Sequence, residues 1–245
     1  MLPKLIHKNF TKSNTNFLFF NADDGLSNAM IRDGGDWEEH IKEKSRELLK
    51  GVDQPTVLDI GANLGAYCIP IAKEIQSMGG TVHVFEPQRI VYYQLCANIV
   101  LNRLDNVYAF NQAVGDYDGM INIPDINYEH NPNIGAFSFV KQYRDAHGLG
   151  PSMSVNNTQV PIIQLDSLTL PTQVDLIKID VEGFEINVFR GSADFLMRNG
   201  YPPILFEVWN FEWFKEGKQE IFDWLVSAGY EITSLNGIDH LAKHP

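Results

Sequence analysis

The sequence has 245 residues, of which 19 are Lys or Arg and 31 are Asp or Glu, so the formal net charge is −12. This length suits one α/β domain, and an apolar fraction of 44% argues against intrinsic disorder. The acidic balance argues against a broad phosphate-binding surface, so we expect no nucleic-acid partner. Two cysteines, Cys68 and Cys96, are too few for a disulfide scaffold.

The chain shows neither a secretion signal nor a membrane-spanning segment. Its first residues, MLPKLIHKNFTKSN, lack an apolar core followed by a cleavage site of small residues. The longest stretch without Asp, Glu, Lys or Arg, Ala146–Leu165, is rich in Gly, Pro, Ser and Asn and is typical of a loop. We therefore expect a cytoplasmic protein without a membrane span. The sequence leaves both a monomer and a homo-oligomer open.

Residues 1–55 form a preamble that lies outside the regular pattern of the chain. It contains an apolar patch, Phe17–Phe20, and a predicted helix, Trp37–Lys50. Nothing in its composition resembles a linker to an independent domain. We expect this preamble to lie over the mouth of the domain that follows.

From residue 56 onward, short apolar runs alternate with helical patterns. Strands are predicted at Thr56–Ile60, Thr81–Phe85, Val107–Phe110, Val174–Ile179, Pro203–Val208 and Tyr230–Leu235. Helices are predicted at Gly65–Gln76, from Pro87 onward, and at Glu212–Ala228. Such alternation predicts a parallel sheet with helices on both faces, which is a three-layer α/β sandwich.

One region, Gly115–Pro171, interrupts the alternation between the third and fourth predicted strands. It holds alternating segments at Met120–Ile123, Ala136–Val140 and Val160–Leu165, joined by stretches rich in turn residues. We interpret it as a β insertion. The sequence thus predicts a main domain over residues 56–245, with this insertion at about residues 115–171.

The ends of the first two predicted strands carry the clearest binding signal. The first runs into Asp59-Ile-Gly61-Ala-Asn63-Leu-Gly65, where small residues let the backbone turn and approach a ligand closely. The second ends at Glu86, where a carboxylate can accept hydrogen bonds from both hydroxyls of a ribose. Together they favour an adenosine-containing cofactor. The alternative is that Glu86 only supplies a charge at the start of a helix.

The spacing of the glycines separates two kinds of cofactor. A dinucleotide fingerprint needs Gly-x-Gly-x-x-Gly, whereas Gly61 and Gly65 are separated by three residues with no third glycine in place. Asp59 would repel a pyrophosphate but would suit the sulfonium and amino groups of S-adenosylmethionine. An NAD-dependent oxidoreductase is the rival interpretation, and no Tyr-x-x-x-Lys pair in the second half supports it. A catalytically silent cofactor-binding protein also stays open.

Several segments together resemble one enzyme family. VLDIGANLGAY, HVFEPQ, NQAVGD, PIIQLDSL, IKIDVEGFEINVFRG and PPILFEV are similar to the FkbM-type S-adenosylmethionine-dependent methyltransferases, over about residues 30–235. The resemblance implies the class I methyltransferase fold, a Rossmann-like sheet of seven strands with one antiparallel strand. It also implies methylation of a hydroxyl on a small molecule, such as a sugar or secondary metabolite, or on a glycan.

The resemblance also implies a cofactor site on this chain. Its methionine and ribose side would be lined by Asp59, Gly61, Asn63 and Gly65. Glu86 would hold the ribose hydroxyls, and Gln112 and Ala113 would flank the adenine. Asp180 would lie nearest the methyl group and its acceptor. The preamble and the insertion would then cover the acceptor side.

Three carboxylates, Asp180, Glu182 and Glu185, fall within six residues after the fourth predicted strand. Asp180 and Glu182 are our candidate catalytic residues, since a positioned carboxylate can take the proton of an attacking alcohol. A second hypothesis is a Mg²⁺ ion held by Asp180 and Glu207 at the ends of neighbouring strands. The alternative for Glu182 and Glu185 is that they are helix N-terminal charges. Lys178, in an otherwise apolar strand, is expected to pair with an adjacent carboxylate.

Overall fold

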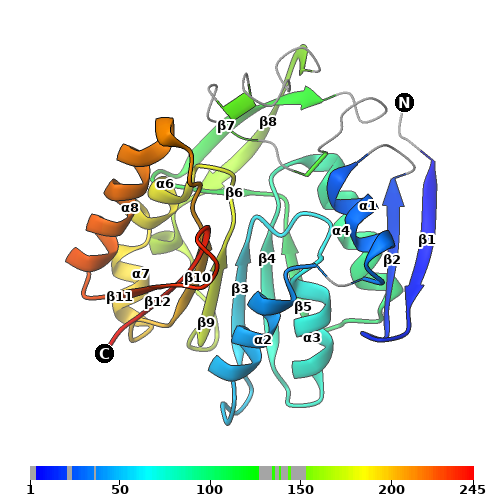
Figure 1. The fold of residues 1–245 in the computed structure, drawn as a ribbon, viewed down its shortest axis with the longest axis horizontal. Coiled ribbons are helices and arrows are strands. Elements are labelled where there is room, and N and C mark those ends of the chain that lie inside the picture. The colour runs from blue at the N-terminus through cyan, green and yellow to red at the C-terminus, as the bar shows by residue number, and fades with distance from the viewer. Residues whose placement is uncertain are drawn as a thin grey trace.

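The computed structural model of the chain describes residues 4–20, 24–35, 37–126, 134–135, 138, 143–144 and 153–245. A central sheet of seven strands lies between two layers of helices (Figure 1). Its strands are β3 (Thr56–Ile60), β4 (Thr81–Phe85), β5 (Val107–Phe110), β9 (Leu176–Ile179), β10 (Ile204–Glu207), β11 (Glu231–Ser234) and β12 (Asp239–Lys243). The main helices are α3 (Cys68–Gln76), α4 (Arg89–Leu101), α6 (Glu185–Arg190), α7 (Ala193–Arg198) and α8 (Lys215–Ser227).

The strand order is β11-β12-β10-β9-β3-β4-β5, and β12 is antiparallel to both of its neighbours. The other adjacent pairs are parallel. The predicted seven-stranded, mostly parallel sheet is therefore confirmed. Strand β12 was not among the strands predicted from the apolar runs, because Asp239-His-Leu-Ala-Lys243 offers only two apolar residues between polar ends.

The predicted elements differ from the observed ones mainly at their starts. The first helix of the main domain begins at Cys68 rather than Gly65, because Gly65 has a left-handed backbone with φ of +97° and belongs to the turn. The next helix begins at Arg89, two residues after Pro87. Three short strands, β3, β4 and β5, have the bounds that the apolar runs predicted. A short 3₁₀ turn, Glu212–Phe214, precedes α8.

Side chains on the two faces of the sheet enter two separate cores. Alternation along β3 sends Val57 to the core that α3 and α4 cover, and Leu58 to the core beneath α6, α7 and α8. The same alternation in β9 separates Leu176 from Ile177. Both cores are closed to solvent, and the edge left for ligands is the one where the parallel strands end.

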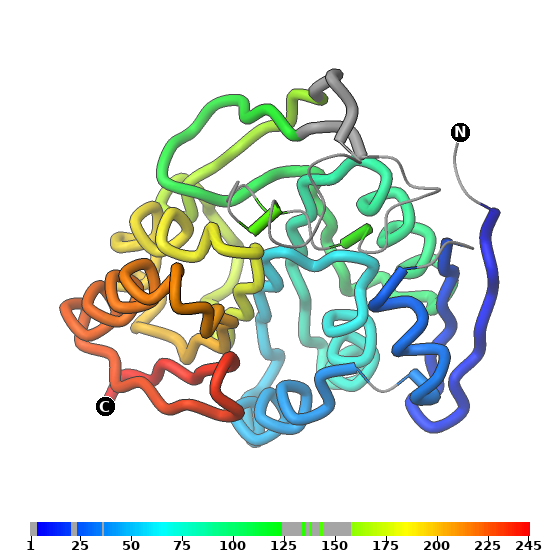
Figure 2. The backbone as a smooth tube through the Cα atoms, turned by 45° about the horizontal axis from the view of Figure 1, so that its top comes forward, coloured from blue at the N-terminus to red at the C-terminus, as the bar shows by residue number. Residues whose placement is uncertain are grey.

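The N-terminal segment is built into the main domain. Its hairpin, β1 (Leu5–Phe10) with β2 (Thr15–Phe20), lies beside α4, and α1 (Gly25–Arg32) and α2 (Glu39–Leu48) follow (Figure 2). Phe17 and Phe19 are fully buried in the α3 and α4 core. None of the described helices is both long and apolar enough to cross a membrane.

The predicted β insertion is present as a separate sheet of three strands. It comprises β6 (Ala113–Val114), β8 (Met153–Ile163) and β7 (Gly119–Ile126), in that spatial order. The alternating segments predicted near residues 120 and 160 both belong to it. The third, Ala136–Val140, lies outside the described residues apart from Ser138.

Replacement of Asn98 should weaken the attachment of the N-terminal hairpin to the main domain. Its amide accepts a hydrogen bond from the backbone N–H of Leu18 (2.7 Å) and donates to the carbonyl of Leu64 (3.0 Å), and the side chain is fully buried. Asn98→Ala leaves these buried groups unpaired, so we expect a loss of about 2–4 kcal/mol in unfolding free energy, measured by urea denaturation. Val100→Ala, at an exposed position of the same helix, is the control. Equal stability of the two variants would contradict this account.

Candidate active site at the strand ends

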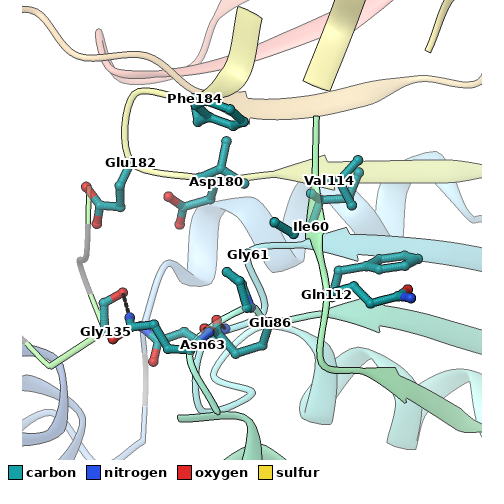
Figure 3. Close-up of a pocket in the computed structure, with 15 residues that line it drawn as sticks. Ile60, Gly61, Asn63, Glu86, Gln112, Val114, Gly135, Asp180, Glu182 and Phe184 are labelled. Carbon is teal, nitrogen blue, oxygen red and sulfur yellow. Dashed lines mark hydrogen bonds between the residues drawn. The ribbon is translucent and has the colours of Figure 1, made fainter. Parts of the chain in front are cut away.

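A cavity opens at the carboxyl ends of β3, β4 and β9 (Figure 3). Its lining residues are Ile60, Gly61, Asn63, Phe85, Glu86, Pro87, Gln88, Gln112, Ala113, Val114, Gly135, Asp180, Val181, Glu182 and Phe184. This set includes most of the residues predicted from the strand ends. Gln112 and Val114 lie toward one end of the cavity and Glu182 and Gly135 toward the other (Figure 3).

Gly61 makes the close approach of two loops possible. Its φ is +87°, and a Cβ atom there would lie 1.8 Å from the backbone oxygen of Asp180. The backbone N–H groups of Gly61 and Ala62 both donate to the carbonyl of Phe85 at 3.0 Å. The loop after β3 is thus held between the ends of β4 and β9, and only glycine fits.

Glu86 is fixed by the backbone around it. Its Oε2 accepts a hydrogen bond from the N–H of Asn63 (2.9 Å), and its Oε1 accepts one from the N–H of Gln88 (2.8 Å). The side chain is almost fully buried, and burial raises the pKa of Glu86 to about 8, although both hydrogen bonds oppose the shift. Each oxygen keeps a lone pair, so the carboxylate can accept further hydrogen bonds from a diol.

Two of the predicted cofactor residues do not line this cavity. Gly65 belongs to the turn before α3, where a Cβ would lie 2.6 Å from Cδ1 of Ile69. Asp59 is fully buried behind the cavity, where its carboxylate lies beside Lys178 and the thiol of Cys68. Burial raises the pKa of Asp59 to about 6, and the nearby Lys178 opposes this. Direct cofactor contacts by Asp59 and Gly65 stay predictions.

The loop after β9 carries the candidate catalytic carboxylates. The backbone N–H of Asp180 donates to the carbonyl of Ile60 (2.9 Å), which ties the ends of β9 and β3 together. Lys178 donates from Nζ to Oδ2 of Asp180 at 3.0 Å, so the predicted pairing of this lysine is present. Glu182 has a left-handed backbone with φ of +53°, and burial together with Asp180 raises its pKa.

Glu185 supports this loop rather than the cavity. Its Oε1 accepts hydrogen bonds from the N–H groups of Val181 (3.2 Å) and Gly183 (3.1 Å), and it is the first residue of α6. The side chain is almost fully buried and does not line the cavity. This favours the interpretation of Glu185 as a helix N-terminal carboxylate.

Three carboxylates from distant segments meet beside Asp180. One oxygen each of Glu38, Asp180 and Glu207 lie within 4.8 Å of one another. Burial, with the neighbouring acids, raises the pKa of Glu38 to about 7 and that of Glu207 to about 10. Oxygen ligands in this number suit Mg²⁺, but the Lys178 ammonium already lies within hydrogen-bond distance of Asp180 and would compete with it. The magnesium hypothesis for Asp180 and Glu207 therefore stays a prediction.

The sequence pattern does not point to several residues that lie at or beside this cavity. Glu38 lies within the predicted helix Trp37–Lys50, where an acidic residue is ordinary, and only the fold brings it to Asp180. Gly135 lies in the insertion, and a Cβ there would clash with the side chain of Asn63. Phe184 also lines the cavity, and its signal in the sequence is its place within the IKIDVEGFE segment.

Comparison with known families gives one decisive match. The family model described as "Methyltransferase FkbM domain" matches residues 59–232, which is most of the chain and includes the ends of β3, β4, β5, β9 and β10. This chain belongs to the FkbM methyltransferase family. The FkbM match ends at residue 232, within β11. It therefore covers the cavity, including the loop after β4 that carries Glu86 and the loop after β9 that carries Asp180 and Glu182.

Individual relatives of this FkbM-family chain are distant. It is 35% identical over 68 residues to a tRNA(Phe) (4-demethylwyosine(37)-C(7)) aminocarboxypropyltransferase of Methanocaldococcus jannaschii, a match covering 28% of this chain and 26% of that protein. The structure of an FkbM methyltransferase from Methylobacillus flagellatus aligns over 78% of this chain and 43% of that one, at 16% identity and a TM-score of 0.49. A precorrin-6y C5,15-methyltransferase from Geobacter metallireducens aligns over 84% and 87%, at 11% identity and a TM-score of 0.49.

Glu86→Ala should weaken binding of S-adenosylmethionine. The substitution removes the only carboxylate at the tip of β4, and hydrogen bonds to a charged group contribute about 1.5–3 kcal/mol each. We expect the dissociation constant to rise by about 10- to 100-fold, measured by isothermal titration calorimetry. The control is Glu231→Ala, at an exposed position of β11. If the Glu86 variant bound S-adenosylmethionine with unchanged affinity, Glu86 would not be a cofactor-binding residue.

The ligand-free protein should lose stability as the pH rises. Burial raises the pKa of Asp59 to about 6, of Glu185 to about 7 and of Glu86 to about 8, so the folded state holds protons that the unfolded chain has released. Unfolding free energy should therefore fall between about pH 5 and 8, by up to about 1.4 kcal/mol per pH unit for each group. Urea denaturation across this range measures the slope. Glu86→Gln should make it shallower, and a stability that rises with pH would refute the account.

Proposed function

We propose that this chain is an S-adenosylmethionine-dependent methyltransferase that methylates a hydroxyl group. The observation that carries the proposal is the arrangement of one cavity, which Glu86 and Asp180 both line with Gly61 between them. Glu86 suits a ribose diol, and the acidic end at Asp180 suits a sulfonium. Membership of the FkbM family supports the same cofactor.

In the proposed reaction, the acceptor oxygen attacks the methyl carbon of the sulfonium. A carbon–oxygen bond forms while the carbon–sulfur bond breaks, and its electron pair stays on sulfur as a neutral thioether. The hydroxyl proton must leave as the oxygen attacks, and the Asp180 carboxylate is the proposed base, with Glu182 beside it. Holding donor and acceptor in line supplies several kcal/mol of the rate enhancement.

The proposed acceptor is a hydroxyl of a small molecule, such as a sugar or secondary metabolite, or of a glycan. Carboxylates are strong acceptors for hydroxyl hydrogen bonds, and both Asp180 and Glu182 line the cavity. Residues of the N-terminal segment and the insertion, Glu38 and Gly135, lie at or beside this cavity, which supports their proposed role as its cover. A cytoplasmic location, the absence of nucleic acid as a partner and the oligomeric state stay predictions.

Two alternatives make different demands on the same site. An NAD-dependent oxidoreductase needs a loop that accepts a pyrophosphate, and the acidic residue Asp59 near Gly61 disfavours one. A silent cofactor-binding protein would keep the cavity but would not transfer the methyl group. Titration with S-adenosylmethionine and with NAD distinguishes the methyltransferase from the oxidoreductase. The methyl-transfer assay described below distinguishes it from the silent cofactor-binding protein.

Asp180→Asn should cost methyl transfer far more than cofactor binding. The assay is transfer of a radiolabelled methyl group from S-adenosylmethionine to a panel of glycans and hydroxylated metabolites. Loss of a general base lowers the rate by about 10²- to 10⁴-fold, whereas we expect cofactor affinity to change by less than about tenfold. Asp223→Asn, at an exposed position of α8, is the control. Unchanged turnover would exclude Asp180 as the base, and cofactor binding without transfer to any acceptor would favour the silent protein.

A further inference from the structure

A cluster of aromatic side chains follows β10, the strand that lies next to β9 in the central sheet. Its members in this segment are Trp209, Phe211, Trp213 and Phe214. Strands β9 and β10 are parallel, so their carboxyl ends meet at the same edge of the sheet. The aromatic cluster therefore lies at the edge where Asp180 and Glu182 line the cofactor cavity.

Tyr143, from the insertion, joins this cluster to the cavity. Its ring stacks on that of Trp209, with the centroids 4.1 Å apart and the planes inclined by 9°. Both side chains are almost fully buried. Burial raises the pKa of the Tyr143 phenol, and the neighbouring carboxyl groups of Glu182 and Glu207 add to this rise. The stacked pair thus extends from the Glu182 end of the cavity to the loop after β10.

Hydrogen bonds hold Tyr143 in this place. Ser138 is fully buried and donates from Oγ to the carbonyl of Glu182 at 2.5 Å. Arg144 donates from Nη1 to the carbonyl of Ser138 at 2.7 Å. Tyr143 is therefore held beside the loop after β9 by residues on either side of it in the chain.

The other end of the cluster faces solvent. Phe211 is 37% exposed and Trp213 is partly exposed, and their rings are parallel within 8° with centroids 5.2 Å apart. We call these two residues the aromatic pair. The Phe211 ring lies 6.3 Å from that of Tyr143, and the Trp213 ring lies 5.9 Å from that of Trp209. The aromatic pair is thus the outer part of a cluster whose inner part lies beside Glu182.

An occupant of this surface has to suit aromatic faces and carboxyl groups together. The face of an aromatic ring carries partial negative charge, which attracts the weakly positive C–H groups on the apolar face of a sugar ring. Carboxyl oxygens accept hydrogen bonds from hydroxyl groups in either protonation state. A phenolic metabolite with a single hydroxyl would serve only one of Asp180 and Glu182. A saccharide offers both an apolar face and several hydroxyl groups.

We propose that the aromatic pair is an acceptor-binding subsite for a second sugar ring, so that the acceptor is an oligosaccharide or glycan rather than a single sugar. The inference rests on the proposed function, which brings the reacting hydroxyl to Asp180. The reacting unit lies at Asp180 and Glu182, and the adjoining unit lies on Phe211 and Trp213. A chain of at least two units fits these two places, because the cluster continues outward from the cavity in layers of rings.

The test measures kcat and KM for saccharides of different length that share one reacting unit. The probes are ladders from single units to tetrasaccharides of glucose, galactose, mannose or rhamnose, beside phenolic metabolites, with a radiolabelled methyl group on S-adenosylmethionine. We expect the wild-type chain to show a KM about 3- to 10-fold lower for the longer members of the ladder that it methylates.

Variants of the aromatic pair should remove this advantage of length. Trp213→Ala and Phe211→Leu should bring the KM of the longer saccharides to that of the single sugar, with kcat within about twofold. Neither residue lines the cofactor cavity, so calorimetry should show an unchanged affinity for S-adenosylmethionine. Phe211→Tyr keeps the ring and should keep the advantage. Tyr93→Ala, at an exposed position of α4, is the matched control and should change nothing.

The outcomes separate this inference from the proposed function. Equal KM values for single and longer saccharides, or transfer to phenolic metabolites alone, would overturn the subsite while leaving the methyltransferase intact. A loss of cofactor affinity in Trp213→Ala and Phe211→Leu would mark the aromatic pair as support for the fold and would overturn the subsite as well. Cofactor binding with no transfer to any probe would overturn both proposals, and failure to bind S-adenosylmethionine would overturn the cofactor assignment itself.

Discussion

The contact between Gly61 and the backbone of Asp180 is the constraint on which the site depends. A Cβ atom on Gly61 would lie 1.8 Å from the Asp180 oxygen, so the loops after β3 and β9 touch through backbone alone. The N–H groups of Gly61 and Ala62 bind the carbonyl of Phe85 and fix the same loop to β4. Three strand ends are thereby locked together, and Glu86 and Asp180 take their places around one cavity because of it.

Much of the fold could be predicted from the sequence because the parallel strands are short, nearly continuous apolar runs. β3, β4 and β5 are short apolar runs with clear ends, and their predicted bounds match the structure. β12 is the counterexample, since its sequence has polar residues at both ends. It turns back antiparallel to β11 and inserts between β11 and β10, and its own residues do not indicate that place. Strand identity followed from local composition, whereas strand order at this edge did not.

The residues of the candidate site also fall into two groups, those that the sequence pattern predicts and those that it does not. Gly61, Asn63, Glu86, Gln112, Ala113, Asp180 and Glu182 follow strand ends, and parallel strands bring such residues to one edge, so sequence reasoning could collect them. Glu38 and Gly135 reach the same place from the preamble and the insertion. No periodicity links them to a strand end, because their positions depend on tertiary packing. Asp59 shows the converse, a residue of the right motif that lies behind the cavity.

The position of Glu38 changes what the N-terminal segment does in this molecule. Phe17 and Phe19 anchor the hairpin in the core, and Asn98 ties it to α4, so the segment is held at many points before it reaches the site. A carboxylate delivered by such a firmly packed segment can keep a fixed distance from Asp180. The strained backbone at Glu38 is then tolerated because the surrounding packing determines it. The preamble is in this sense part of the electrostatic environment of the cavity as well as its cover.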